Sequence, residues 1–101
     1  MIITNNKERN RFETEVNGEL AFLDYEFYQG DLALVHTFVP PRLRHQGIAF
    51  ALVKFGLEFA KEQNLKVIAG CSSVVIFVER HPKYESLLIT ANDYFLWLKQ
   101  N

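Results

Sequence analysis

The stretch from Leu32 to Gly70 reads LALVHTFVPPRLRHQGIAFALVKFGLEFAKEQNLKVIAG. Its first eight residues, Leu32–Val39, are apolar on both faces, which is typical of a central strand covered on both sides. After Gly47, an apolar pattern with a narrow polar stripe predicts one helix to about Gln63, packed against a sheet. The segment Leu65–Gly70 predicts a short strand. Because strand–helix–strand units join parallel strands, we expect Leu65–Gly70 to lie parallel to Leu32–Val39.

Antiparallel strands are predicted before this unit. The segment Arg11–Val16 alternates between apolar or small and charged residues, which indicates a half-buried strand. Asn17-Gly18 is a strong hairpin signal, and it leads into a partner strand over Glu19–Tyr28. Ile2 and Ile3 predict a short edge strand. The residues expected to face the core from the partner strand are Ala21, Leu23, Tyr25 and Phe27.

A second helix is predicted after the last strand. Ser72 or Ser73 is the expected cap of a helix from Val74 to about Arg80. Glu79 and Arg80 are expected to form its solvated face. The tail, residues 92–101, suits either a helix or an edge strand. The chain is therefore predicted to be an α/β (α+β) protein, with antiparallel strands leading into a parallel β-α-β unit and helices packed on the sheet.

Composition restricts the class of protein. The 101 residues are 49% hydrophobic, which fits a single domain over residues 1–101 with a substantial core. The net charge is −1 and no basic run occurs, so we expect no nucleic-acid partner. No apolar run is long enough to span a bilayer, so we expect no membrane partner. The single cysteine suits a reducing, cytoplasmic location, and no cluster of metal ligands is recognisable.

The glycine at the start of the long helix needs a reason, because glycine is a poor helix former. In the sequence Arg44-His45-Gln46-Gly47, small residues would let an anion approach the free backbone N–H groups of the helix N-terminus. Arg44 would add a bidentate cation. This combination predicts a site for a phosphate or pyrophosphate. The alternative is that Gly47 only permits a tight turn or close packing of the helix on the sheet.

The order of these elements resembles the GNAT superfamily of acetyl-CoA-dependent N-acetyltransferases. Its signature is Arg or Gln, two residues, Gly, one residue, then Gly or Ala, which Arg44, Gly47 and Ala49 match. The resemblance is closer to the short single-domain members and covers roughly residues 10 to 88. The shared features are His36-Thr37, the proline-rich exit to the turn Arg44–Ile48, the run Asn64–Val67, Cys71, and Arg80, His81, Pro82 and Tyr84.

The resemblance implies a minimal GNAT-like fold in which the two central strands splay apart and acetyl-CoA or coenzyme A lies between them. The loop would hold the pyrophosphate, and the strand would pair with the pantetheine arm and polarise the acetyl carbonyl. The residues that would bind this cofactor are Thr37, Phe38, Val39, Arg44, His45, Gln46, Gly47, Ile48 and Ala49.

The chain departs from the broader family at the position of its general acid. Cys71 takes the place of an asparagine, Val74 that of an alanine, and Val78 that of the tyrosine that reprotonates the thiolate. Cys71, at a strand end before a helix, is therefore a candidate nucleophile or proton donor, or else a small buried apolar residue. His36 is a candidate general base or else a hydrogen-bonded core histidine, and we expect it on the face of Leu34 and Phe38.

Three functions are compatible with these residues. The first is transfer of an acetyl group from acetyl-CoA to a primary amine on a small molecule or a peptide. The second is a non-catalytic module or sensor that binds coenzyme A or an acyl-CoA, which the missing tyrosine favours. The third is an interaction protein that only keeps the fold. Aromatic residues near the C-terminus, such as Trp97, are compatible with a homodimer.

Overall fold

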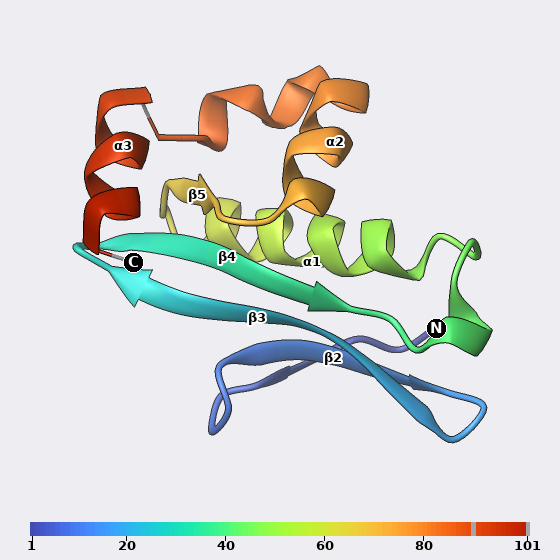
Figure 1. Ribbon diagram of the computed structural model, residues 1–101. Helices are drawn as coiled ribbons and strands as arrows, with labels where there is room; N and C mark the ends of the chain where they lie inside the picture. The colour runs from blue at the N-terminus through green and yellow to red at the C-terminus, as the bar shows by residue number, and fades with distance from the viewer. Residues whose placement is uncertain (90, 101) are drawn as a thin grey trace.

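The computed structural model describes residues 1–89 and 91–100 (Figure 1). One mixed sheet has the strand order β1-β2-β3-β4-β5, antiparallel except that β5 runs parallel to β4. The fold is therefore the mixed α/β architecture that was predicted. The strands are β1 (Thr4–Asn6), β2 (Arg11–Val16), β3 (Glu19–Tyr28), β4 (Asp31–Phe38) and β5 (Val67–Ala69). The helices are α1 (Ile48–Glu62), α2 (Ser72–Arg80) and α3 (Ala91–Gln100), with 3-10 turns η1 (Pro41–Leu43) and η2 (Pro82–Leu87).

The boundaries of the strands follow the turn residues. Asn17 and Gly18 both have positive φ, 52° and 79°, as a two-residue hairpin turn between β2 and β3 requires. The edge strand β1 begins two residues later than predicted, at Thr4. The segment before it is still held, because the Thr14 hydroxyl donates to the carbonyl of Ile2 at 2.7 Å. The sequence predicted that an edge strand exists but not the residues that form it.

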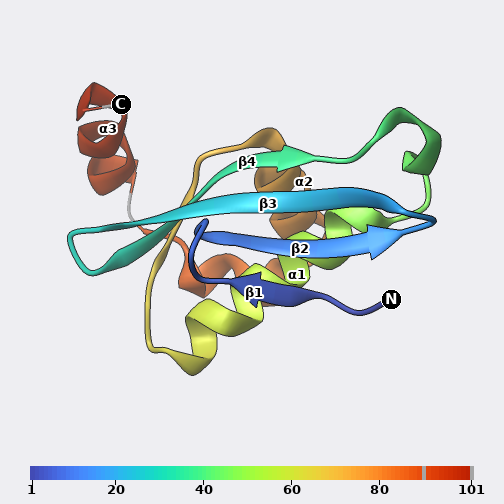
Figure 2. The same ribbon diagram turned by 90° about the horizontal axis from the view of Figure 1, so that it is seen from below.

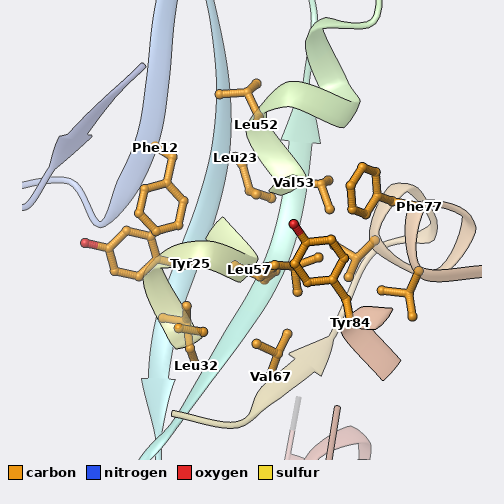
Figure 3. Close-up of a cluster of buried hydrophobic side chains, with 14 of the residues drawn as sticks. Phe12, Leu23, Tyr25, Leu32, Leu52, Val53, Leu57, Val67, Phe77 and Tyr84 are labelled. Carbon is orange, nitrogen blue, oxygen red and sulfur yellow. The ribbon is translucent and has the colours of Figure 1, made fainter. Parts of the chain in front are cut away.

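The main core lies between one face of the sheet and helices α1 and α2 (Figures 1 and 3). Phe12 from β2 and Leu23 from β3 pack there against Leu57 from α1, and all three are fully buried. Tyr84 reaches the same cluster from η2. Phe27 was expected in this core but is 58% exposed; it lies one residue before the end of β3 at Tyr28.

Strand β4 contains a bulge that the sequence pattern does not reveal. Tyr25 of β3 pairs with Leu34, whereas the neighbouring Asp24 pairs with His36. Val35 is therefore an extra residue on β4. A single extra residue reverses the faces occupied by the side chains that follow it.

The bulge corrects the predicted orientation of His36. Thr37 pairs with Leu23, a core residue, and so lies on the face that α1 covers. His36 and Phe38 consequently lie on the opposite face, and both are exposed. The expectation that His36 shares a face with Leu34 is wrong.

Helix α3 covers a limited part of the second face. Ala33, Ile68 and Trp97 form a separate buried cluster there. Strand β4 is thus covered on both sides only over its first half, not along its whole length as predicted. Seen from below, β1, β2 and β3 lie in front of α1, with α3 off to one side (Figure 2). Of the two alternatives for the tail, a helix or an edge strand, the structure shows the helix over Ala91–Gln100.

The crossover from α1 to β5 ends the parallel unit. Asn64 adopts a positive φ of 58°, and the N–H of Leu65 donates to the carbonyl of Ala60 at 2.9 Å, which closes the helix C-terminus. At the far end of β5, a Cβ on Gly70 would lie 2.8 Å from the carbonyl oxygen of Leu34, so only glycine fits without a shift of backbone. Within the described residues, no helix is long and apolar enough to cross a membrane.

Candidate functional site

A cleft of about 830 Å³ opens at the C-terminal end of β4. This volume lies within the range of roughly 300–1,000 Å³ that is typical of ligand sites. Its walls come from β4, from the loop through η1 to the first turn of α1, and from α2. The lining residues are His36, Thr37, Phe38, Val39, Leu43, Arg44, His45, Gly47, Ile48, Ala49, Phe50, Ser73 and Arg80.

The cleft arises because β5 is much shorter than β4. The ladder between the two strands ends at the pair Leu34–Ala69, followed by a bond from the N–H of Gly70 to the carbonyl of Leu34 at 2.9 Å. The chain then turns away into α2, while β4 continues to Phe38. Past Leu34, β4 therefore extends beyond its parallel partner, and its edge faces the cleft.

The N-terminus of α1 forms a second wall with backbone donors. Gly47 is the N-cap, with φ of 79°, and Ala51 makes the first intrahelical bond, to the carbonyl of Gly47 at 3.0 Å. The N–H groups of Ile48, Ala49 and Phe50 thus have no acceptor within the helix. No described side chain caps this end, and apart from Gly47 and its two chain neighbours no described atom lies within 4 Å of where a Cβ on Gly47 would be. An anion has open access to these donors and to the positive end of the helix dipole.

The charged side chains around the cleft are cationic. They are the arginines Arg44 and Arg80; two histidines also line it, and no described aspartate or glutamate does. Arg44 is anchored through a hydrogen bond from Nε to the carbonyl of Val39 at 3.0 Å. Arg80 lies across from it on α2, with its guanidinium carbon 5.5 Å from the centre of the Phe50 ring. A chain with a net charge of −1 therefore concentrates positive charge in one cleft.

Comparison with known proteins agrees with this geometry. A family model described as GCN5-related N-acetyl-transferase matches residues 11–87. The chain belongs to this family. Protein NATD1 of Mus musculus is 32% identical over 83 residues, which is 79% of this chain and 76% of that protein. Protein NATD1 of Danio rerio is 33% identical over 87 residues, 81% of this chain and 79% of that protein.

The fold comparison gives the same result for the GCN5-related family. The solution NMR structure of a GCN5-like protein from Staphylococcus aureus superposes with a TM-score of 0.68 and 31% identity, and covers 87% of each chain. The resemblance noted from the sequence and the predicted fold class are therefore confirmed. Helix α3, which packs on β4 and β5 through Trp97, lies beyond the range matched by the family model.

Cys71 lies beside the cleft of this family member. It is the N-cap of α2, which begins at Ser72 and not at Val74, so the predicted capping role of Ser72 or Ser73 is wrong. The Cys71 Sγ atom lies 3.3 Å from Thr37 Oγ1, and either atom can be the donor. Thr37 lines the cleft. The half-buried Cys71 is not among the described lining residues, but it contacts Thr37.

The predicted residues divide clearly between the cleft and its surroundings. All the residues expected to bind the cofactor line the cleft except Gln46, whose Nε2 donates to the carbonyl of Arg42 at 3.4 Å. His36 lines it from the opposite face of β4. Arg80 is exposed as predicted, yet it also lines the cleft. The lining residues that sequence reasoning did not select are Leu43, Phe50, Ser73 and Arg80.

One signal could have found two of those residues. Ser73 and Arg80 are seven positions apart, so on a helix they share a face. Because α2 follows β5 directly, that face turns toward the cleft. Leu43 and Phe50 are apolar, and nothing in the sequence separates them from core residues.

The base of α2 is held by Tyr84 and His81. The Tyr84 hydroxyl donates to Glu58 Oε2 at 2.7 Å and connects η2 to α1. Burial, followed by the hydrogen bond to Glu58 and the charge of that carboxylate, raises the pKa of Tyr84 to about 12. The His81 ring stacks on Phe77 with centroids 4.1 Å apart, and its Nδ1 lies 2.9 Å from the Phe77 carbonyl oxygen. His81 thus packs on the last turn of α2.

Proposed function

We propose that this chain binds acetyl-CoA in the cleft and transfers the acetyl group to a primary amine. The observation that carries the proposal is a cationic cleft that joins the open N-terminus of α1 to the free edge of β4. Membership of the GCN5-related family supports it. The residues present fit the cofactor, because Gly47 leaves room for a pyrophosphate and the described lining offers donors and no carboxylate.

The chain's own groups would divide the binding as follows. The N–H groups of Ile48–Phe50 donate to phosphate oxygens, with Arg44 and Arg80 supplying countercharge. The edge of β4 from Thr37 to Val39 pairs with the amides of the pantetheine arm. The remaining apolar residues of the lining cover the arm.

When bound, acetyl-CoA supplies an activated thioester carbonyl. Transfer forms a bond between the amine nitrogen and the carbonyl carbon and breaks the carbon–sulfur bond. One proton must leave the nitrogen and one must reach the departing sulfur. His36 is the proposed acceptor of the first, since it lines the cleft from the opposite face of β4. Cys71, held beside Thr37, is the proposed donor of the second.

Binding without turnover is the second candidate function. Val78, in the place of the family's tyrosine, is buried in the core and offers no proton. No described carboxylate lines the cleft to act as a base. This chemistry favours a coenzyme A sensor if Cys71 proves inert.

Thermal unfolding with coenzyme A tests the binding step. Ligand at about a hundred times its dissociation constant adds about 2.7 kcal/mol to the free energy of unfolding. Gly47→Val should abolish the increase in melting temperature. Gly30→Val is the matched control, since Gly30 also has a positive φ, 82°, and no described atom within 4 Å, but it lies in the β3–β4 turn. No increase in the parent protein at millimolar coenzyme A would exclude both candidate functions.

Intact mass measurement and thiol release test the transfer step. The protein is mixed with acetyl-CoA and a panel of amines, and free coenzyme A is measured. Release that falls in Cys71→Ala supports proton transfer by Cys71, and an acetyl adduct lost in that variant identifies it as a nucleophile instead. Binding without release or adduct would favour the sensor.

A further inference from the structure

The face of the sheet opposite α1, here called the outer face, runs directly into the cleft. The bulge at Val35 turns His36 and Phe38 onto it, and both residues line the cleft. Figure 2 looks onto this side, where β1, β2 and β3 lie in front of α1. Two cross-strand rows form the centre of the outer face: Glu13, Phe22 and Phe38 in one, and Arg11, Asp24 and His36 in the next.

The outer face exposes apolar side chains together. The rings of Phe22 and Phe38 lie 5.5 Å apart, and Phe38 is 37% exposed. Leu20, on the next row toward the β2–β3 hairpin, is 41% exposed. Of the described helices, α3 packs on the other end of β4, over Ala33, and leaves these residues uncovered. Apolar side chains gathered on one face of a small protein indicate a binding surface.

One cationic side chain, that of Arg11, already lies on the outer face and contacts both an aromatic ring and a carboxylate there. The guanidinium carbon of Arg11 lies 3.8 Å from the centre of the Phe22 ring, and its Nε is 2.9 Å from Asp24 Oδ1. A ring and a carboxylate thus bind a cation jointly. Within residues 1–89 and 91–100, this is the ion pair of the outer face. Glu13, beside Phe22, accepts a hydrogen bond from the Asn6 amide at 3.2 Å, and Glu15 is exposed on the row of Leu20.

We propose that the outer face binds a basic, lysine-bearing peptide segment in an extended conformation and presents a lysine amine to the rim of the cleft. The acceptor role rests on the proposed acetyl transfer, whereas the binding does not. Charge complementarity supports this partner, because Glu13 and Glu15 add negative charge next to the Phe22 ring and the exposed Phe38 ring. The cationic cleft, in contrast, attracts the anionic cofactor, so the two ligands are sorted by charge.

The shape of the surface favours a peptide over a small amine. Small ligands bind in concave pockets that bury most of their surface. The outer face is the exposed side of a sheet, and among the described residues the cleft reaches it at His36 and Phe38 alone. An extended chain can lie across Leu20, Phe22 and Phe38 and still place one side chain at the cleft.

Fluorescence anisotropy with a labelled eight-residue peptide of alternating lysine and serine tests the proposal at low ionic strength. We expect the parent protein to bind it, and Glu13→Gln combined with Glu15→Gln to weaken binding about fivefold. The control combines Glu62→Gln with Glu79→Gln, exposed residues of α1 and α2, which changes the net charge equally and should leave binding unchanged. The same peptide with every lysine acetylated should not bind.

Several results would overturn the proposal. The first is that both double variants weaken peptide binding equally. The second is that the parent protein does not bind the peptide. The third is that spermine displaces the peptide with the same affinity as the peptide itself. A dimer in sedimentation experiments that Phe38→Ala dissociates would assign the face to a second copy of the chain. Coenzyme A melting shifts, measured on the same variants, should persist in the Glu13/Glu15 variant. Their absence in the parent with peptide binding intact would contradict the proposed function alone.

Discussion

His36 and Thr37 are neighbours in the chain, yet their side chains lie on opposite faces of the sheet. Consecutive residues of a strand alternate in this way. The extra residue Val35 decides which face each one occupies, because it shifts the pairing of β4 with β3 and so turns Thr37, not His36, toward α1. Thr37 contacts Cys71 on the α1 side at 3.3 Å, whereas His36 joins the outer face. The two candidate proton-transfer groups, His36 and Cys71, therefore lie on opposite sides of β4.

Tyr84 makes a prediction for alkaline pH. Its pKa is about 12 in the folded chain, against 10 when exposed, so the folded state holds the proton more tightly. The resulting stability is complete below pH 10 and is lost as the pH rises from 10 to 12. We expect the difference in unfolding free energy between the parent and Tyr84→Phe to shrink over this interval, as measured by urea denaturation.

Glu58→Gln is the companion variant for this prediction. Glutamine keeps an acceptor for the Tyr84 hydroxyl and removes the charge. Burial is the largest cause of the raised pKa of Tyr84. In Glu58→Gln, the loss of unfolding free energy with rising pH should therefore become smaller but should not vanish. An unchanged difference between the parent and Tyr84→Phe from pH 8 to pH 12 would contradict the assignment.

At the scale of the element, the first turn of α1 has opposite requirements for stability and for binding. It contains no acidic residue, although a carboxylate there would favour the helix. We expect Ala49→Glu to stabilise the chain by about 0.3–1 kcal/mol through the helix dipole. The same charge should remove the coenzyme A melting shift, because it competes for the N–H groups and repels phosphate.

Ala49→Gln separates charge from size in this experiment. Glutamine has the same volume and no charge, so it should retain part of the coenzyme A shift and give little stabilisation. Both are measured by thermal unfolding with and without ligand. Equal loss of the shift in the two variants would mean that bulk, and not the helix dipole, governs the site.

Over the whole molecule, a nearly neutral chain separates its charges by surface. The cleft carries Arg44 and Arg80, while Glu13 and Glu15 lie on the outer face. Arg80 reaches the cleft only because α2 returns beside α1 after β5. Arg44, the other arginine of the cleft, comes from the loop before α1, so the position of Arg80 beside it depends on the complete fold.

Arg80→Gln should weaken coenzyme A binding by about tenfold to a hundredfold, because a hydrogen bond to a charged group contributes about 1.5–3 kcal/mol. Isothermal titration at two salt concentrations measures the affinity and its dependence on ionic strength, which should also fall. Lys54→Gln, an exposed cation on the solvent side of α1, is the control and should bind as the parent does. Equal effects of the two variants would show that only net charge matters.

Periodicity and turn residues in the sequence were sufficient for most elements. Alternation predicted β2 and β3, Asn17-Gly18 predicted their turn, and the apolar stripe after Gly47 predicted α1. These patterns are local, because neighbouring residues determine which backbone conformation buries the apolar side chains. The open donors of the loop at Gly47 were predictable for the same reason, since a helix N-terminus carries its donors within one turn.

The sequence by itself determined the order of the strands and helices and the loop at Gly47. Only the tertiary structure decided that Val35 is a bulge, that His36 faces away from Cys71, and that Arg80 completes the cleft. The bulge depends on the pairing of two strands, and the cleft depends on the early end of β5 beside β4. Both are relations between segments distant in the chain, and a pattern along one segment carries no information about its partner's register.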